Sequence, residues 1–166
     1  ISISPGDTLL ALPRWISITL VAYLSIQIAA NSFRAQRFLA LLYAVAVVHA
    51  IYGLQLLFQF GDTILFTEKW AYKGFATGGF VNRNSFATFL ALGACIGAVR
   101  IADAFQERSP ARGRGFWLLD LREGPLLTIL GLTIILTALV ATGSRMGVAS
   151  GIVGMLVALG LHAARR

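Results

Sequence analysis

The chain has little of the charge on which soluble domains depend. Of its 166 residues only 13% are charged, whereas 57% are hydrophobic, and the mean hydropathy is +0.77. Soluble domains average roughly a quarter charged residues, so this composition excludes an ordinary soluble enzyme and indicates a membrane protein. The single cysteine, Cys95, excludes a disulfide framework and any cysteine-built metal site within the chain, because each needs at least two thiols.

Acidic residues are also scarce. Seven Asp and Glu face fourteen Lys and Arg, which leaves a net charge of +7. The basic residues are scattered between apolar runs rather than gathered on a polar face, so nucleic acid is not the expected partner. The sequence lacks both the phosphate-binding loop and the dinucleotide fingerprint. We therefore predict no cofactor, no metal and no nucleic-acid partner, and we expect the lipid bilayer to surround the chain.

The beginning of the chain lacks a start methionine and the pattern of a signal peptide. It opens at Ile1, without a basic stretch followed by an apolar core and a small-residue cleavage site. We expect the chain, residues 1–166, to be the central transmembrane portion of a longer protein.

Long apolar segments dominate what is present. A helix needs about 20 mostly apolar residues to cross roughly 30 Å of hydrocarbon. The pattern predicts an all-α, polytopic transmembrane bundle of about five helices. They are expected at residues 9–30, 38–58, 80–99, 125–142 and 146–164.

The basic residues also predict the orientation of these helices. Nine fall on one side of the predicted membrane: Arg34, Arg37, Arg100, Arg108, Arg112, Arg114, Arg122, Arg165 and Arg166. Five fall on the other: Arg14, Lys69, Lys73, Arg83 and Arg145. By the positive-inside rule the nine lie in the cytoplasm, so the loop 59–85 and the turn 143–145 are expected to face outward.

The third apolar segment places polar residues at the outer edge of the membrane. Its uncharged part, from Phe86 to Val99, is fourteen residues long, about 21 Å of helix. We expect the helix to extend back to Phe80, with Asn82, Arg83 and Asn84 in its first turn. Free amides and the helix dipole favour a phosphate there. In the alternative interpretation, Arg83 only snorkels to the interface while an asparagine caps the helix.

A second arginine is expected at the same rim. Residues 125–164 are apolar except at Gly143, Ser144 and Arg145, which predicts a tight helical hairpin whose turn uses the conformational freedom of Gly143 and Gly147. Together Arg83 and Arg145 could grip a diphosphate bidentately. Each could equally be an interfacial anchor.

Three other ionisable residues are weaker candidates for a functional role. His49 lies near the middle of the second predicted helix, where a neutral imidazole bonded between helices is favoured over a proton relay. Asp62 and Glu68 in the outward loop could serve as general bases. The surrounding aromatic and charged residues are more typical of a segment lying on the membrane interface.

Two motifs resemble the O-antigen ligase and O-antigen polymerase family of bacterial multi-pass membrane proteins. The first motif is Ala76-Thr77-Gly78-Gly79-Phe80-Val81-Asn82-Arg83-Asn84-Ser85-Phe86-Ala87. The second motif is Ser144-Arg145-Met146-Gly147. Supporting similarity is found in Ala50-Ile51-Tyr52-Gly53-Leu54-Gln55.

The resemblance implies a GT-C-like fold in the bacterial inner membrane, with its active face toward the periplasm. It implies an inverting, metal-independent glycosyltransferase of lipopolysaccharide or polysaccharide biosynthesis. The donor would be a glycan on undecaprenyl diphosphate, and the acceptor would be the lipid A core or a growing polysaccharide. Arg83 and Arg145 match the diphosphate-binding arginines of the family. Asn82, Asn84 and Ser144 are expected to orient phosphate or sugar oxygens.

The chain departs from the family pattern in two respects. Ser85 stands where family members often have His, and Gly79 where Thr is frequent. The family's large periplasmic loop, with its catalytic His, lies beyond the second motif and is not present in this chain. Neither His49 nor His162 stands in a matching context, so no catalytic residue is assigned.

Two alternatives of other classes stay open from the sequence. A transporter or flippase domain for an anionic lipid or sugar would also use arginines at the rim, although polar or broken helices would be expected near the midplane. A helical scaffold without a ligand would use them as anchors. Ligase and polymerase share the donor and differ in the acceptor, so these motifs do not separate them.

Overall fold

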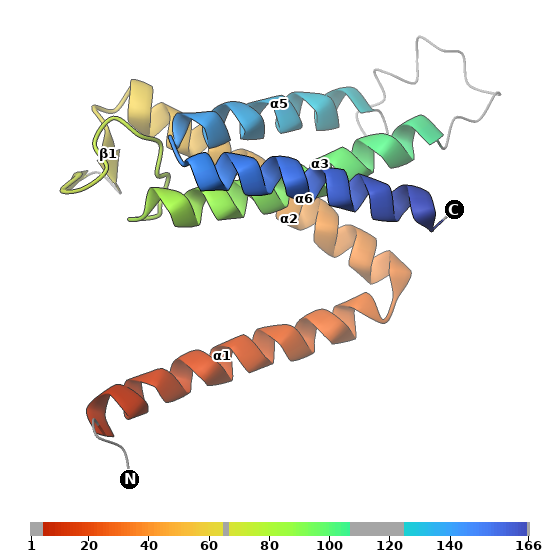
Figure 1. Ribbon diagram of the computed structural model, residues 1–166, viewed down its shortest axis with the longest axis horizontal. Helices are drawn as coiled ribbons and strands as arrows, with labels where there is room; N and C mark the ends of the chain where they lie inside the picture. Colours follow the sequence, from red (N-terminus) through yellow and green to blue (C-terminus); the bar gives the residue numbers. More distant parts are fainter. Residues whose placement is uncertain (1–4, 65–66, 107–124, 166) are drawn as a thin grey trace. The chain divides into compact units, whose positions relative to one another are not determined.

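The chain is predominantly helical. The computed structural model describes residues 5–64, 67–106 and 125–165. This part contains helices α1 (Pro5–Ala29), α2 (Ser32–Phe58), α3 (Arg83–Gln106), α5 (Pro125–Ala141) and α6 (Arg145–Ala164). A short antiparallel hairpin of β1 (Thr63–Ile64) and β2 (Thr67–Glu68) lies between α2 and α3 (Figure 1). The predicted all-α helical class is confirmed.

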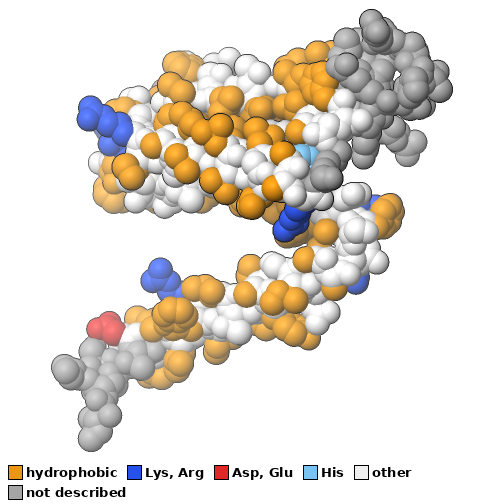
Figure 2. All heavy atoms as spheres, turned by 45° about the vertical axis from the view of Figure 1, so that its right-hand side comes forward, with side chains coloured by type: hydrophobic (Ala, Val, Ile, Leu, Met, Phe, Trp, Pro, Cys, Tyr) orange, Lys and Arg blue, Asp and Glu red, His pale blue; other side chains and the backbone are white. Residues whose placement is uncertain are grey.

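Four of these helices are long and apolar enough to cross a membrane. They are α2, α3, α6 and the part of α1 from Leu9 to Ala29. Helix α5 is apolar but has only 17 residues, so a fifth crossing stays a prediction. Hydrophobic side chains cover much of the visible surface, and Lys and Arg appear near helix ends (Figure 2). Such an apolar exterior is expected where lipid replaces water.

The chain forms two compact units, residues 1–41 and 42–166, and the boundary falls within α2. None of the described side chains in the first unit is buried. Three hydroxyl groups of α1 bond to carbonyls one turn earlier: Ser17 to Pro13, Thr19 to Trp15 and Ser25 to Val21, at 2.7 to 2.9 Å. These bonds satisfy the hydroxyl groups without water, as an apolar surrounding requires.

In the second unit α3 is the central helix. Half of its most apolar stretch is buried, and it packs extensively against both α5 and α6, which contact each other far less. Small residues allow these close approaches: a Cβ built on Gly93 of α3 would lie 2.5 Å from the Cβ of Ala46 in α2. The core comprises Tyr43, Ala46, Ala50, Ala76, Phe86, Ala87, Leu90, Ala94, Ile96, Ile135, Ala138 and Leu139.

The predicted start of the third helix was wrong. Helix α3 begins at Arg83 rather than near Phe80 and continues to Gln106 instead of ending near Val99. The amide of Phe80 donates to the carbonyl of Thr77 at 2.9 Å, which closes a turn before the helix. With 24 residues, about 36 Å at the usual rise, α3 gains its length at its C-terminal end.

The predicted turn between the last two helices is confirmed. Helix α5 ends at Ala141 and α6 begins at Arg145. Gly143 has φ +61°, a left-handed conformation that glycine adopts without steric cost. Gly147 lies inside α6 rather than in the turn, and it packs closely on Ala87 of α3.

Candidate functional site

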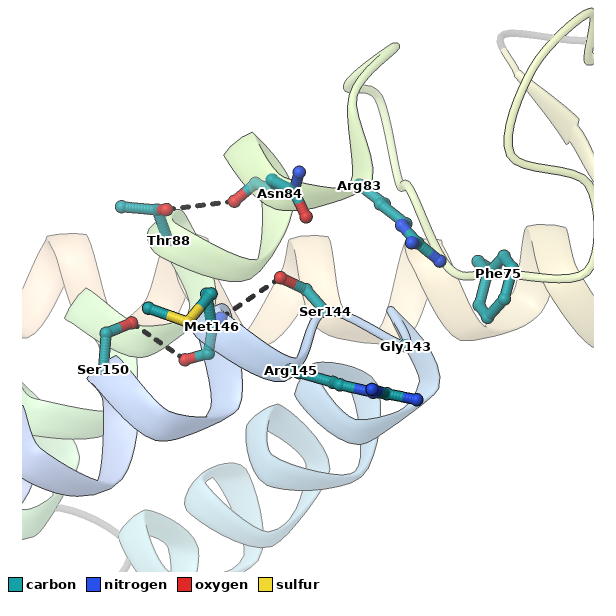
Figure 3. A pocket seen from close by; sticks show the side chains of 10 residues that line it. Phe75, Arg83, Asn84, Thr88, Gly143, Ser144, Arg145, Met146 and Ser150 are labelled. Atoms are coloured by element: carbon teal, nitrogen blue, oxygen red, sulfur yellow. Dashed lines mark hydrogen bonds between the residues drawn. The ribbon is translucent and has the colours of Figure 1, made fainter.

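A cavity of about 770 Å³ lies where α3 and α6 begin (Figure 3). The preceding loop and the turn before α6 complete its wall. Among the described residues, its lining combines two arginines with small, polar and apolar side chains and contains no Asp, Glu, Lys or His. The lining residues are Phe75, Arg83, Asn84, Thr88, Gly143, Ser144, Arg145, Met146, Gly147 and Ser150.

The two arginines reach this cavity because α3 and α6 run in the same direction. Gly147 of α6 packs against Ala87 of α3, and further along Gly154 packs against Cys95. Arg83 and Arg145 are the first residues of these parallel helices. Their helices therefore direct free backbone amides and positive dipole ends toward the same region.

Polar caps set the start of both helices. The side-chain oxygen of Asn82 accepts a hydrogen bond from the amide of Asn84 at 2.8 Å. The hydroxyl of Ser144 accepts one from the amide of Gly147 at 3.1 Å. Asn and Ser are preferred caps because their short side chains satisfy amides that lack a partner within the helix. Each cap is followed directly by an arginine, so the two helices begin with the same polar arrangement.

Arg83 is half-buried between aromatic rings. Its guanidinium carbon lies 4.4 Å from the centroid of the Phe75 ring and 5.4 Å from that of Tyr72. Its Nε is buried and has no hydrogen-bond partner among the described residues. Within the described ranges no carboxylate pairs with this side chain. An arginine placed in this way retains its charge and its donors for an anion.

Arg145 is exposed and lines the same cavity. In Figure 3 its side chain and that of Arg83 extend in the same direction, toward the side where Phe75 lies. The described residues offer Arg145 no acidic partner either. Within the part of the chain that the structure describes, the two positive charges on the cavity wall are therefore uncompensated.

Four of the five predicted binding residues line this one cavity: Arg83, Asn84, Ser144 and Arg145. Asn82 is not among the lining residues, and its side chain caps α3. The hydroxyl of Ser144 is also used as a cap, although the residue remains part of the wall. The hydrogen bond that Asn82 forms is therefore the one expected in the alternative interpretation, in which an asparagine caps the helix.

Six residues of the wall were not predicted as part of the site, and two of them, Gly143 and Gly147, had been considered only for the turn. Thr88 and Ser150 lie about one helical turn beyond Asn84 and Met146, so helical spacing from the two motifs could have identified them. Met146 itself stands inside the second motif. Phe75 could not be predicted from the sequence, because the position of a loop residue depends on the course of the loop backbone.

The acidic residues of the loop between α2 and α3 lie outside the wall. Asp62 pairs with the ammonium group of Lys69, and Glu68 pairs with Lys73 at 2.6 Å. The hydrogen bond and the charge of Lys73 lower the pKa of Glu68, which is opposite to the change that would favour a general base near neutral pH. Lys69 is only 2% exposed, so its side chain does not lie at the membrane interface, as was predicted for this loop segment.

The histidines have structural contacts. His49 Nδ1 lies 2.9 Å from the carbonyl oxygen of Val45 in its own helix, so the predicted bond between helices was wrong. Its ring contacts Phe89 edge-on at 5.3 Å. His162 Nε2 of α6 lies 3.3 Å from Asp103 Oδ1 of α3. Among the described residues no group of three His, Cys, Asp or Glu side chains is arranged to hold a metal ion.

Comparisons of the chain with known protein families, curated proteins and solved structures find no match. The resemblance to the O-antigen ligase and polymerase family therefore stays a prediction from the two motifs.

Proposed function

We propose that the cavity binds the diphosphate of a lipid-linked glycan at the membrane surface. The observation that supports this proposal best is the pair Arg83 and Arg145, which line one cavity without an acidic partner in the described chain. Two guanidinium groups can bind several oxygens of a diphosphate by charge-assisted hydrogen bonds. The first amides and the dipoles of α3 and α6 add to the attraction.

We further propose that the chain is part of an inverting membrane glycosyltransferase of the O-antigen ligase and polymerase type. The donor is a glycan on undecaprenyl diphosphate, and the acceptor is the lipid A core or a growing polysaccharide at the periplasmic face of the bacterial inner membrane. An acceptor hydroxyl attacks the anomeric carbon while the bond to the diphosphate breaks. Arg83 and Arg145 stabilise the negative charge that develops on this leaving group.

The residues that the structure describes in the wall of the cavity include no carboxylate or imidazole to accept the proton of the acceptor. We therefore assign leaving-group binding to this cavity and assign none of its residues as the base. The isolated chain is expected to bind the donor without transferring its glycan. Glycan transfer by the purified chain would contradict this part of the proposal.

Binding of undecaprenyl diphosphate to the chain in nanodiscs tests the proposal. Arg83→Ala and Arg145→Ala should each weaken binding by roughly 10- to 100-fold, the loss expected for a charge-assisted hydrogen bond. The double variant should lose less than the sum of the two losses, because both residues hold one ligand. Arg165→Ala is a matched control, since Arg165 is exposed at the far end of α6.

The outcome separates the proposed function from its alternatives. Binding that is absent or that ignores both arginines would leave them as interfacial anchors. Arginine-dependent binding followed by transport of the lipid across vesicles, without transfer in the full-length protein, would favour the flippase alternative.

A further inference from the structure

An ion pair between buried Lys69 and half-buried Asp62 lies in the loop that leads to the cavity. Lys69 follows β2 directly, and its side chain is 1% exposed. Its Nζ donates to the carboxylate of Asp62 and, at 2.8 Å, to the carbonyl of Phe75. A buried ammonium group needs such partners, because its desolvation is costly. The loop must therefore arrange its backbone around Lys69.

The same ion pair holds the backbone next to Phe75 from two sides. Asp62 Oδ2 accepts a hydrogen bond from the amide of Gly74 at 2.5 Å, while Lys69 binds the Phe75 carbonyl. Asp62 itself is attached to α2, since its amide donates to the carbonyl of Leu56 at 2.9 Å. The ion pair thus connects the end of α2 to residues 74 and 75.

The next residue attaches the loop to another helix. The amide of Ala76 donates to the carbonyl of Ala141, the last residue of α5, at 2.9 Å. With its backbone held on both sides, Phe75 places its ring against the Arg83 guanidinium and in the cavity wall (Figure 3). Arg83 has no acidic group in the described chain to orient it, so this aromatic contact is its principal restraint.

We infer that the Asp62–Lys69 ion pair positions Arg83 for anion binding by holding Phe75 against its guanidinium group. Asp62 and Lys69 are positioning residues, since neither lines the cavity. The inference rests on the proposed function for the role of Arg83 as an anion ligand. The placement of Arg83 itself can be tested without any ligand.

Lys69→Met is the main test variant, and Lys73→Met is its matched control. Lys73 is in the same loop and also forms an ion pair, but both Lys73 and its partner Glu68 are exposed. Lys69→Met should weaken binding of undecaprenyl diphosphate by roughly three- to thirtyfold, as expected when a partly desolvated cation–π contact is lost. Lys73→Met should leave the affinity within about twofold, because exposed ion pairs contribute little.

A double-mutant cycle distinguishes positioning from a general loss of structure. Lys69→Met should cost nothing further in an Arg83→Ala background, because the residue that it positions is gone. In an Arg145→Ala background its full cost should remain. An equal cost in both backgrounds would overturn the inference, since it would mean that Lys69 supports the loop in general.

A ligand-independent readout separates this inference from the proposed function. Phenylglyoxal modifies guanidinium groups, and mass spectrometry of peptides reports each arginine separately. Lys69→Met should accelerate modification of Arg83 and leave that of Arg145 unchanged. An unchanged rate at Arg83 would overturn the positioning role. A faster rate in a protein whose wild type does not bind undecaprenyl diphosphate would support positioning and refute the proposed function.

A second variant covers the case in which Lys69→Met fails to fold. Phe75→Leu removes the ring while keeping the backbone carbonyl that Lys69 binds. It should reproduce both effects, the weaker diphosphate binding and the faster modification of Arg83, and Phe75→Tyr should restore wild-type behaviour. If Phe75→Leu changes neither measurement, the inference is wrong.

Discussion

Gly147 of α6 lies so close to Ala87 of α3 that a Cβ built on the glycine would be 2.4 Å from the alanine Cβ. The same built atom would lie 2.9 Å from the Ser144 hydroxyl that caps α6. Close packing and helix capping therefore coincide at one end of the helix pair. This end is also where Arg83 and Arg145 enter the cavity wall.

Gly147→Ala should destabilise the protein by about 1 to 3 kcal/mol, the usual cost of forcing a methyl group into a packed contact. Gly160→Ala is the matched control, because a Cβ there meets nothing within 4 Å. The control should be neutral or stabilising, since alanine favours helix more than glycine does. Thermal unfolding followed by circular dichroism in one detergent provides the comparison. Equal melting temperatures for the two variants would contradict the close contact.

Gly143→Ala should weaken diphosphate binding as well as lower stability. Gly143 has φ +61° and a built Cβ would lie 2.3 Å from the Phe75 ring, so the turn and the ring cannot both stay in place. The left-handed backbone alone costs about 1 to 2 kcal/mol for a residue with a side chain. Gly79→Ala is the control, because a Cβ there meets nothing within 4 Å. Undiminished affinity in Gly143→Ala would show that Phe75 can move without disturbing the site.

Tyr43→Phe should destabilise the second unit by about 0.5 to 1.5 kcal/mol, the net contribution of a typical hydrogen bond. The Tyr43 hydroxyl donates to the carbonyl of Thr128 in α5 at 2.5 Å, and the side chain is buried. The substitution keeps the ring and removes only this bond. Tyr52→Phe provides the control, because the structure records no hydrogen bond for the Tyr52 hydroxyl in the described chain. Equal melting temperatures of the two variants would contradict the assigned role.

The exposed Glu68–Lys73 pair predicts a small effect of pH. Lys73 lowers the pKa of Glu68, so the pair stabilises the fold above the ordinary pKa of a glutamate and loses this contribution as pH falls through the lowered value. Glu68 raises the pKa of Lys73, so the stabilisation from the charge of Lys73 is lost as pH rises through the raised pKa.

Glu68→Gln should therefore lower the melting temperature slightly at neutral pH and low salt. The difference should disappear in strong acid, where Glu68 of the wild type is protonated as well. It should also shrink in high salt, because the pair is exposed and screened. A difference that persists in acid would have to come from something other than this ion pair.

Several boundaries were predictable because local chemistry sets them. The predicted second helix ended at residue 58, where α2 ends, and the fourth ended at residue 142, next to Ala141 at the end of α5. The start of α3 was placed too early because apolar length alone was considered. The decisive feature was the Asn82 side chain, which caps the helix by a bond to the amide of Asn84.

The candidate site was predictable only in part. Arg83 and Arg145 were identified because arginines next to apolar runs need an interface or an anion. Phe75 and Lys69 were not, since their roles depend on the path of the loop. That path is determined by hydrogen bonds to partners on α2 and α5, among them Leu56 and Ala141.

The sequence by itself determined the membrane class, the positions of the apolar helices and the placement of an arginine at the start of two of them. These properties follow from the length of apolar runs and from neighbouring capping residues, so they need no distant contact. The tertiary structure alone decided that α3 and α6 pack side by side, with Arg83 and Arg145 on one cavity wall. This pairing depends on the fit between the Gly147 and Gly151 face of α6 and the Ala87 and Ala91 face of α3. Such a fit is a property of two surfaces together, which neither segment contains alone.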